Sequence, residues 1–135
     1  MRYLIALLAI AGIVVSTLAL RIHYSTDAPP CDINAHWDCG TVNHSRYSVI
    51  YGIPVAAIGI AGYAAIAILA LIRRYRLLLV VSLVGLAFTL YLTSIEARIL
   101  QIWCLYCAIS QGIMALITVC SIVPAIQSRK ATKLR

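Results

Sequence analysis

Apolar residues form four long runs in this chain, and charged side chains are absent from all of them. The runs cover residues 3–20, 52–72, 77–95 and 103–126. A helix of about 20 residues crosses a hydrocarbon core about 30 Å thick. Because lipid offers no hydrogen-bond partners to the backbone, each run is predicted to be a transmembrane helix.

The segments between and after these runs complete the predicted architecture. Residues 21–51 are expected to form a long loop outside the membrane, and residues 127–135 a short basic tail. The composition agrees, since 63% of the residues are hydrophobic and only 11% are charged, against about a quarter in soluble proteins. The sequence therefore predicts an all-α membrane protein, a four-helix bundle forming one domain over residues 1–135.

Basic residues predict the orientation of the bundle. One side of the membrane would hold eight of the eleven Lys and Arg residues, which are Arg2, Arg73, Arg74, Arg76, Arg129, Lys130, Lys133 and Arg135. Cytoplasmic loops carry the excess of positive charge, so both termini are expected in the cytoplasm. The long loop, all four acidic residues and all three histidines then lie outside. The net charge of +7 is read as a topology signal, and nucleic-acid binding is not expected.

The first run could instead be a cleaved signal peptide. Its apolar stretch is longer than the roughly 7–15 residues of a signal core, only Arg2 precedes it, and no clear cleavage site follows. We therefore expect it to be a retained membrane helix.

Four of the five cysteines are predicted to lie at the outer membrane face. Cys31 and Cys39 belong to the long loop, and Cys104 and Cys107 to the outer end of the fourth helix. Disulfides persist on that side of a membrane. Since the orientation was assigned from basic residues alone, this placement is independent support for redox chemistry.

The pair Cys104 and Cys107 has the spacing of a redox motif. At positions i and i+3 of one helix the two thiols share a face and can form a disulfide. The helix N-terminus beside them favours thiolate, the nucleophile of disulfide exchange. One turn further on, Gln111 could donate a hydrogen bond to a lipid-soluble ligand or to a neighbouring helix. Cys120 is expected to be an ordinary buried thiol facing away from the pair.

Taken together, these motifs resemble the vitamin K epoxide reductase family. The matching features are Cys31 and Cys39 separated by seven residues, a hydroxyl group at Ser45, the sequence Gly-Ile-Pro at residues 52–54, and the Cys-x-x-Cys pair of the last helix. The resemblance extends over residues 5–126. It implies a four-helix bundle that binds a quinone near its outer end.

The resemblance also implies residue roles. Cys107 would react with the quinone, Cys104 would be its disulfide partner, Cys39 would exchange with Cys104, and Cys31 would meet the thiols of a partner protein. Ser45 would help close the loop over the quinone, and Asp32 would orient the loop. The residues expected to contact the quinone are Asn43, Ser48 and Gln111.

Two positions depart from animal members of the family. Gln111 stands where they have Tyr, and Ser48 stands where they have Asn before the second helix, so the identity of the quinone (ubiquinone, menaquinone or vitamin K type) is left open. Microbial members oxidise a thioredoxin-like (DsbA-like) protein while reducing a membrane quinone. The resemblance therefore implies a bacterial or archaeal membrane enzyme for disulfide formation, with a separate thioredoxin-like partner.

Several alternatives have distinct signatures. The same series of thiol–disulfide exchanges could instead reduce vitamin K epoxide. A second family of four-span oxidases has its two cysteine pairs in the reverse order. Four cysteines could bind zinc, but the seven-residue spacing fits poorly, and no metal site is predicted. A small transporter would usually carry an ionisable group within a span. Purely structural disulfides are the remaining possibility.

Overall fold

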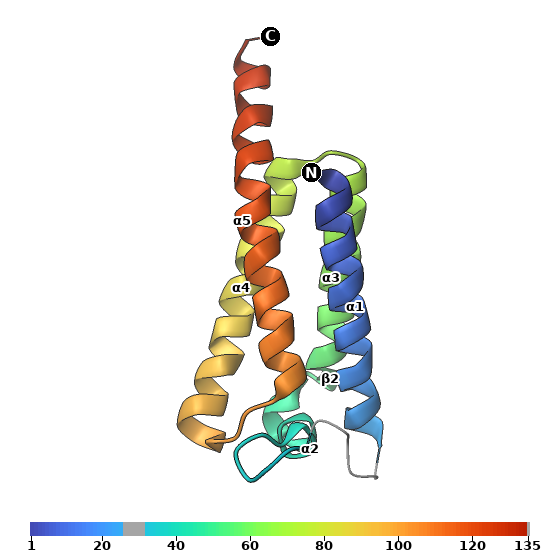
Figure 1. Cartoon of the computed structure of the whole chain (residues 1–135), viewed down its shortest axis with the longest axis vertical. Coiled ribbons are helices and arrows are strands. Elements are labelled where there is room, and N and C mark those ends of the chain that lie inside the picture. The colour runs from blue at the N-terminus through green and yellow to red at the C-terminus, as the bar shows by residue number, and fades with distance from the viewer. Residues whose placement is uncertain (26–31, 135) are drawn as a thin grey trace.

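Four long helices stand side by side in the structure, a computed structural model that describes residues 1–25 and 32–134 (Figure 1). They are α1 (Arg2–Tyr24), α3 (Val55–Leu71), α4 (Tyr75–Ile95) and α5 (Leu105–Lys133). The shorter elements are α2 (Cys39–His44), the 3-10 turn η1 (Arg46–Ser48), strands β1 (Val49–Ile50) and β2 (Ile53–Pro54), and the π-helical turn η2 (Glu96–Leu100). The prediction of an all-α bundle agrees with this arrangement.

Three of the helices are long and apolar enough to cross a membrane. They are Arg2–Tyr24, Tyr75–Leu100, in which η2 continues α4, and Leu105–Lys133. The fourth, α3, is also apolar but has only 17 residues. At about 1.5 Å per residue it is about 26 Å long, close to the thickness of a hydrocarbon core.

Both termini lie at one end of the bundle, and α2 lies at the other (Figure 1). The turn between α3 and α4 is at the same end as the termini. This end therefore carries the basic residues that the sequence assigned to one side of the membrane. Cys39 at the start of α2, and Cys104 and Cys107 at the start of α5, are at the opposite end.

Several predicted boundaries were wrong. Helix α1 continues to Tyr24 and α5 continues to Lys133, so the expected tail over residues 127–135 is largely helical. Lys, Arg, Ala and Gln favour helix, and beyond the lipid a helix needs no apolar side chains. The region 21–51 is likewise not a simple loop, since it contains the end of α1, the helix α2 and one strand.

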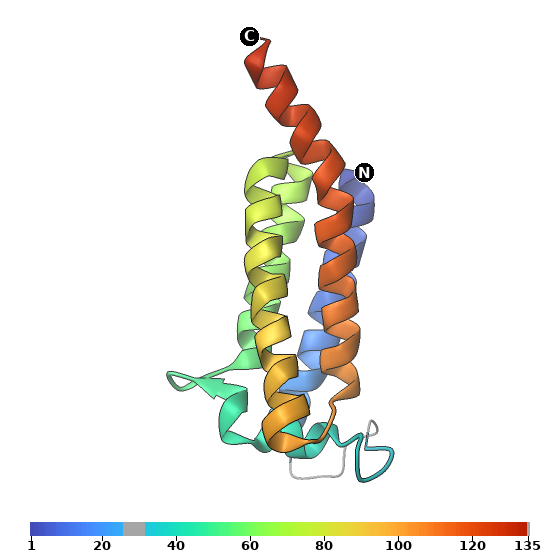
Figure 2. The same ribbon diagram turned by 90° about the vertical axis from the view of Figure 1, so that its left-hand side faces the viewer.

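The second apolar run begins as a hairpin and not as a helix. Val49 pairs with Pro54, and Ile50 with Ile53. Tyr51 and Gly52, which connect the strands, have φ values of 51° and 80°. Two consecutive residues at positive φ are typical of a type I′ turn, where glycine is favoured. The hairpin extends sideways from the bundle (Figure 2), and the second run turns helical only at Val55.

The core packs most closely where α1 meets α3. Tyr63 of α3 is 1% exposed, and its ring lies where a Cβ at Gly12 would be. The Tyr63 hydroxyl reaches α5, where it donates to the carbonyl oxygen of Ser110 at 2.7 Å. Gly12 therefore allows one side chain to tie three helices together.

We predict that Gly12→Ala destabilises the bundle. The new methyl group would overlap the Tyr63 ring, and overpacking of this kind typically costs about 1–3 kcal/mol. Gly112→Ala is the matched control, because no atom lies within 4 Å of a Cβ built there. Thermal unfolding in detergent should give a lower midpoint for Gly12→Ala only. Equal midpoints for the two variants would contradict this packing.

Candidate active site

A short backbone bridge joins the segment before α2 to the segment before α5. The N–H of Trp103 donates to the carbonyl oxygen of His36 at 2.7 Å, and the N–H of Asp38 donates to that of Trp103 at 2.9 Å. Trp37 and Trp103 thereby form a parallel β-bridge, with ring centroids 6.3 Å apart. Each bridging tryptophan is followed within two residues by a cysteine. The bridge therefore holds one cysteine from each predicted pair at the same place.

The first turn of α2 is held by two carboxylates. Asp38 caps the helix, accepting from the N–H of Thr41 at 2.9 Å, and this backbone hydrogen bond is the main cause that lowers the pKa of Asp38. Asp32 accepts from the N–H of Gly40 at 3.1 Å. The resemblance implied that Asp32 orients the loop, and in the structure its contact is with the first turn of α2. Residues 34–36, which follow Asp32, form bends.

Three cysteines meet at this end of the bundle. Cys39 is disulfide-bonded, whereas Cys104 and Cys107 are free thiols. The sulfur atoms of Cys104 and Cys39 are 3.5 Å apart, and both residues are fully buried. Cys31, the fourth predicted site cysteine, lies outside the described residues. A disulfide bond is about 2.0 Å long, so a modest approach of the two sulfurs would allow exchange.

Cys104 lies one residue before α5 and caps it. The two thiols were predicted to lie on one helix, but the helix starts at Leu105, and the Cys104 sulfur accepts from the N–H of Cys107 at 3.4 Å. The Asn43 side-chain amide donates to the same sulfur at 3.6 Å. Two N–H groups thus point at the Cys104 sulfur. Donors of this kind favour thiolate, which is the nucleophilic form of cysteine.

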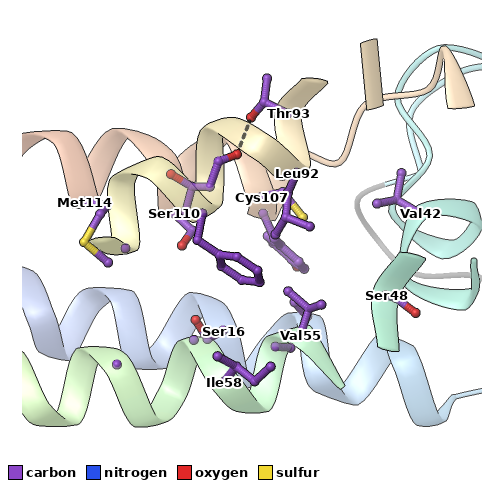
Figure 3. Close-up of a pocket in the computed structure, with 18 of the residues that line it drawn as sticks. Ser16, Val42, Ser48, Val55, Ile58, Leu92, Thr93, Cys107, Ser110 and Met114 are labelled. Carbon is purple, nitrogen blue, oxygen red and sulfur yellow. Dashed lines mark hydrogen bonds between the residues drawn. The ribbon is translucent and has the colours of Figure 1, made fainter. Parts of the chain in front are cut away.

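Beside the thiols, the bundle encloses a mainly apolar cavity of about 520 Å³. Figure 3 shows Cys107 among its lining residues, between the helices and the segment that carries Val42 and Ser48. Cavities of about 300–1,000 Å³ with apolar walls and a few polar groups are typical of small-molecule sites. The free thiol of Cys107 thus faces a space that suits a hydrophobic ligand.

Only some of the residues that were predicted to contact the ligand line the cavity. Asn43, Ser45 and Ser48 line it. The Ser45 hydroxyl donates to the carbonyl oxygen of Val42 at 2.7 Å, and the Ser48 hydroxyl donates to that of Ser45 at 2.7 Å. These bonds order the chain that leads from α2 to the hairpin, along one side of the cavity.

Gln111 is not among the described residues that line the cavity. Its side-chain oxygen accepts a hydrogen bond from the Thr93 hydroxyl of α4. In this structure Gln111 therefore bonds to a neighbouring helix, which was one of the two contacts considered for it. Ser110, its neighbour, does reach the cavity.

A buried carboxyl group that sequence reasoning left without a role belongs to the same site. Glu96 is 5% exposed, and its Oε2 atom accepts from the N–H of Cys104 at 3.3 Å. Its side chain also interacts with that of Cys107, and it lines the cavity. The sequence feature that could have pointed to Glu96 is its position, eight residues before Cys104 and directly after an apolar run.

The sequence model of the vitamin K epoxide reductase family matches residues 3–122 of this chain. The match extends from α1 to the last third of α5 and contains every cysteine discussed above.

We predict that Cys39 and Cys104 crosslink when their other partners are removed. In a variant carrying Cys31→Ser and Cys107→Ser, mild oxidation should join these two sulfurs, which start 3.5 Å apart. Cys120 remains as the internal control, because it packs against a separate part of the bundle core. Peptide mapping under non-reducing conditions would identify the bond. A Cys39–Cys120 product, or free Cys39 after oxidation, would contradict the geometry.

Proposed function

Because the chain belongs to the vitamin K epoxide reductase family, we propose that it is a membrane thiol-disulfide oxidoreductase that passes electrons from a thioredoxin-like protein to a bound quinone. One observation carries the proposal: the free sulfur of Cys104 lies 3.5 Å from the disulfide-bonded sulfur of Cys39. The free thiol of Cys107 lines the adjacent apolar cavity. Cys39, Cys104, Cys107 and a space for a ligand thus follow one another in the structure.

Electrons enter at the loop pair in this mechanism. A partner thiolate attacks the disulfide of Cys31 and Cys39, and the partner's second thiol resolves the mixed disulfide, so the partner is oxidised and the loop pair is reduced. The Cys39 thiolate then attacks Cys104 of an oxidised helix pair, and Cys107 leaves as thiolate. Cys31 attacks Cys39 in turn, which restores the loop disulfide and leaves Cys104 and Cys107 reduced.

The bonding of the described cysteines corresponds to one stage of this cycle. Cys39 is oxidised while Cys104 and Cys107 are free. This is the state reached after the loop pair has passed its electrons on. The helix pair then loses two electrons and two protons to the quinone and becomes a disulfide again.

The cavity wall supports a quinone as the acceptor. Its apolar surface matches a flat hydrophobic ring of the kind shared by ubiquinone, menaquinone and vitamin K. Asn43 and Ser48 are polar residues on this largely apolar wall. Polar groups in such sites orient the ligand.

The same proposal includes the membrane topology. With α3 counted as a short span, four helices cross the membrane and both termini lie in the cytoplasm, on the side that carries most basic residues. The cysteines then lie on the oxidising side of a bacterial or archaeal membrane, where a separate thioredoxin-like protein can reach them.

We expect two cysteine variants to fail at different steps. In the presence of reduced thioredoxin-like protein and a short-chain quinone, Cys39→Ala and Cys107→Ala should each lower steady-state quinone reduction by roughly 100-fold or more, since each removes a covalent intermediate. Cys107→Ala should still oxidise partner thiols once through its loop disulfide, whereas Cys39→Ala should not. The measurements are quinone absorbance and partner thiol content.

Cys120→Ala is the control and should retain the parent rate. The relay would be wrong if both site variants oxidised partner continuously at the parent's rate.

A further inference from the structure

Glu96 occupies an unusual position for a carboxyl group. It begins the π-helical turn η2 at the end of α4 and is 5% exposed. It is the only acidic side chain among the described residues that line the cavity. Ionisable groups within membrane-spanning segments are costly and typically functional.

A purely structural role would not require an acid. The contact that fixes Glu96 is a hydrogen bond from the N–H of Cys104 to its Oε2 atom, at 3.3 Å. The oxygen of a glutamine amide could accept the same bond without the cost of burying an ionisable group. The position therefore carries a proton-binding group where a neutral acceptor of the same shape would stabilise the fold equally well.

Glu96 is also the carboxyl group that lies beside the thiols, since it accepts from the N–H of Cys104 and lines the cavity with Cys107. Its titratable neighbours are Cys104 and Cys107, and its side chain interacts with that of Cys107. Nearby histidine rings are already engaged: Nδ1 of His23 lies 2.6 Å from the carbonyl oxygen of Asn43, and the two ring nitrogens of His44 lie 2.8 and 3.0 Å from carbonyl oxygens.

We propose that Glu96 is a catalytic proton carrier, which takes the proton of the Cys107 thiol and delivers it to the quinone. This role rests on the proposed function, since quinone reduction needs protons at the cavity. Glu96 can serve it because its carboxyl group is hydrogen-bonded to the backbone of the helix pair at Cys104 and lines the same cavity as Cys107.

The step is balanced over the helix pair. The S–H bonds of Cys104 and Cys107 break and the S–S bond between them forms, which releases two electrons and two protons. The quinone takes both electrons. One proton passes from Cys107 through Glu96 to the nearer ring oxygen, and Glu96 returns to its starting form. The Cys104 proton is released to water at the membrane surface, and water supplies the proton for the second ring oxygen.

Two substitutions separate proton transfer from a structural role, because the two roles predict opposite orders of activity. Glu96→Gln keeps the shape and the hydrogen-bond acceptor but cannot carry a proton. Glu96→Asp keeps the carboxyl group but shortens the side chain by one methylene. We expect Glu96→Gln to lower the single-turnover rate of quinone reduction by the pre-reduced protein by about 100-fold, the usual scale of general acid–base catalysis. Glu96→Asp should stay within about tenfold of the parent.

Arg98→Gln is the matched control. Arg98 lies in the same π-helical turn, is exposed and does not line the cavity, so its loss should leave the rate unchanged. Quinone affinity, measured separately, should be unchanged in Glu96→Gln, and so should formation of the Cys39–Cys104 crosslink. These two measurements report an intact site in the slow variant.

Each other outcome would count against the role. An active Glu96→Gln with an inactive Glu96→Asp would show a structural acceptor and overturn it. If Glu96→Gln does not fold, the test rests on Glu96→Asp. A rate of quinone reduction by Glu96→Asp below about one hundredth of the parent's would then overturn the role. A parent protein that reduces no quinone would overturn the proposed function and this role with it, whereas an active parent with an equally active Glu96→Gln would overturn this role alone.

Discussion

The site depends on two backbone hydrogen bonds that Trp103 makes with His36 and Asp38. They pair two segments that are more than sixty residues apart in the chain and lie at the same end of the bundle (Figure 1). Main-chain pairing of this kind is directional, so it sets the approach of the two segments more strictly than side-chain packing alone. Cys39 and Cys104 follow directly, and their 3.5 Å separation is a consequence of that pairing. Without this pairing, no backbone contact would hold the Cys39 and Cys104 thiols next to each other.

Regular helices and the irregular segments at their ends have different roles in this bundle. Helices α1, α3, α4 and α5 supply the apolar walls of the cavity, where close contacts such as Gly12 with Tyr63 leave little freedom. The reactive groups sit where the regular helices stop: Cys39 at the start of α2, Cys104 at the cap of α5, and Glu96 in the π-helical turn. Helix ends offer unpaired N–H groups, and one of them donates to the Cys104 sulfur. The chemistry therefore lies at helix ends beside a rigid ligand space.

Much of this arrangement could be predicted from the sequence, because uncharged runs of about 20 residues have few alternatives to membrane helices. The positions of the cysteines relative to those runs indicated two thiol pairs at one membrane face, and the family resemblance implied that Cys39 meets Cys104. The exact start of α5 could not be predicted, because hydropathy does not distinguish Trp103, in a backbone bridge, from Leu105, in a helix. Gln111 was assigned to the ligand from its spacing to Cys107, but helical spacing does not determine whether a side chain faces the cavity or α4. Glu96 was overlooked because a charge at the end of an apolar run is ordinarily solvated, and its burial results from the tertiary fold.

The central claim is the order of the cysteine pairs, with the helix pair next to the quinone and the loop pair behind it. The most direct test starts from protein with all four site cysteines reduced, mixes it with a short-chain quinone, quenches with acid at successive times and maps the disulfides. We expect the Cys104–Cys107 bond to form first and the bond between Cys31 and Cys39 to follow. A loop disulfide that forms first, or that forms at the same rate when Cys107 is replaced by Ala, would contradict it.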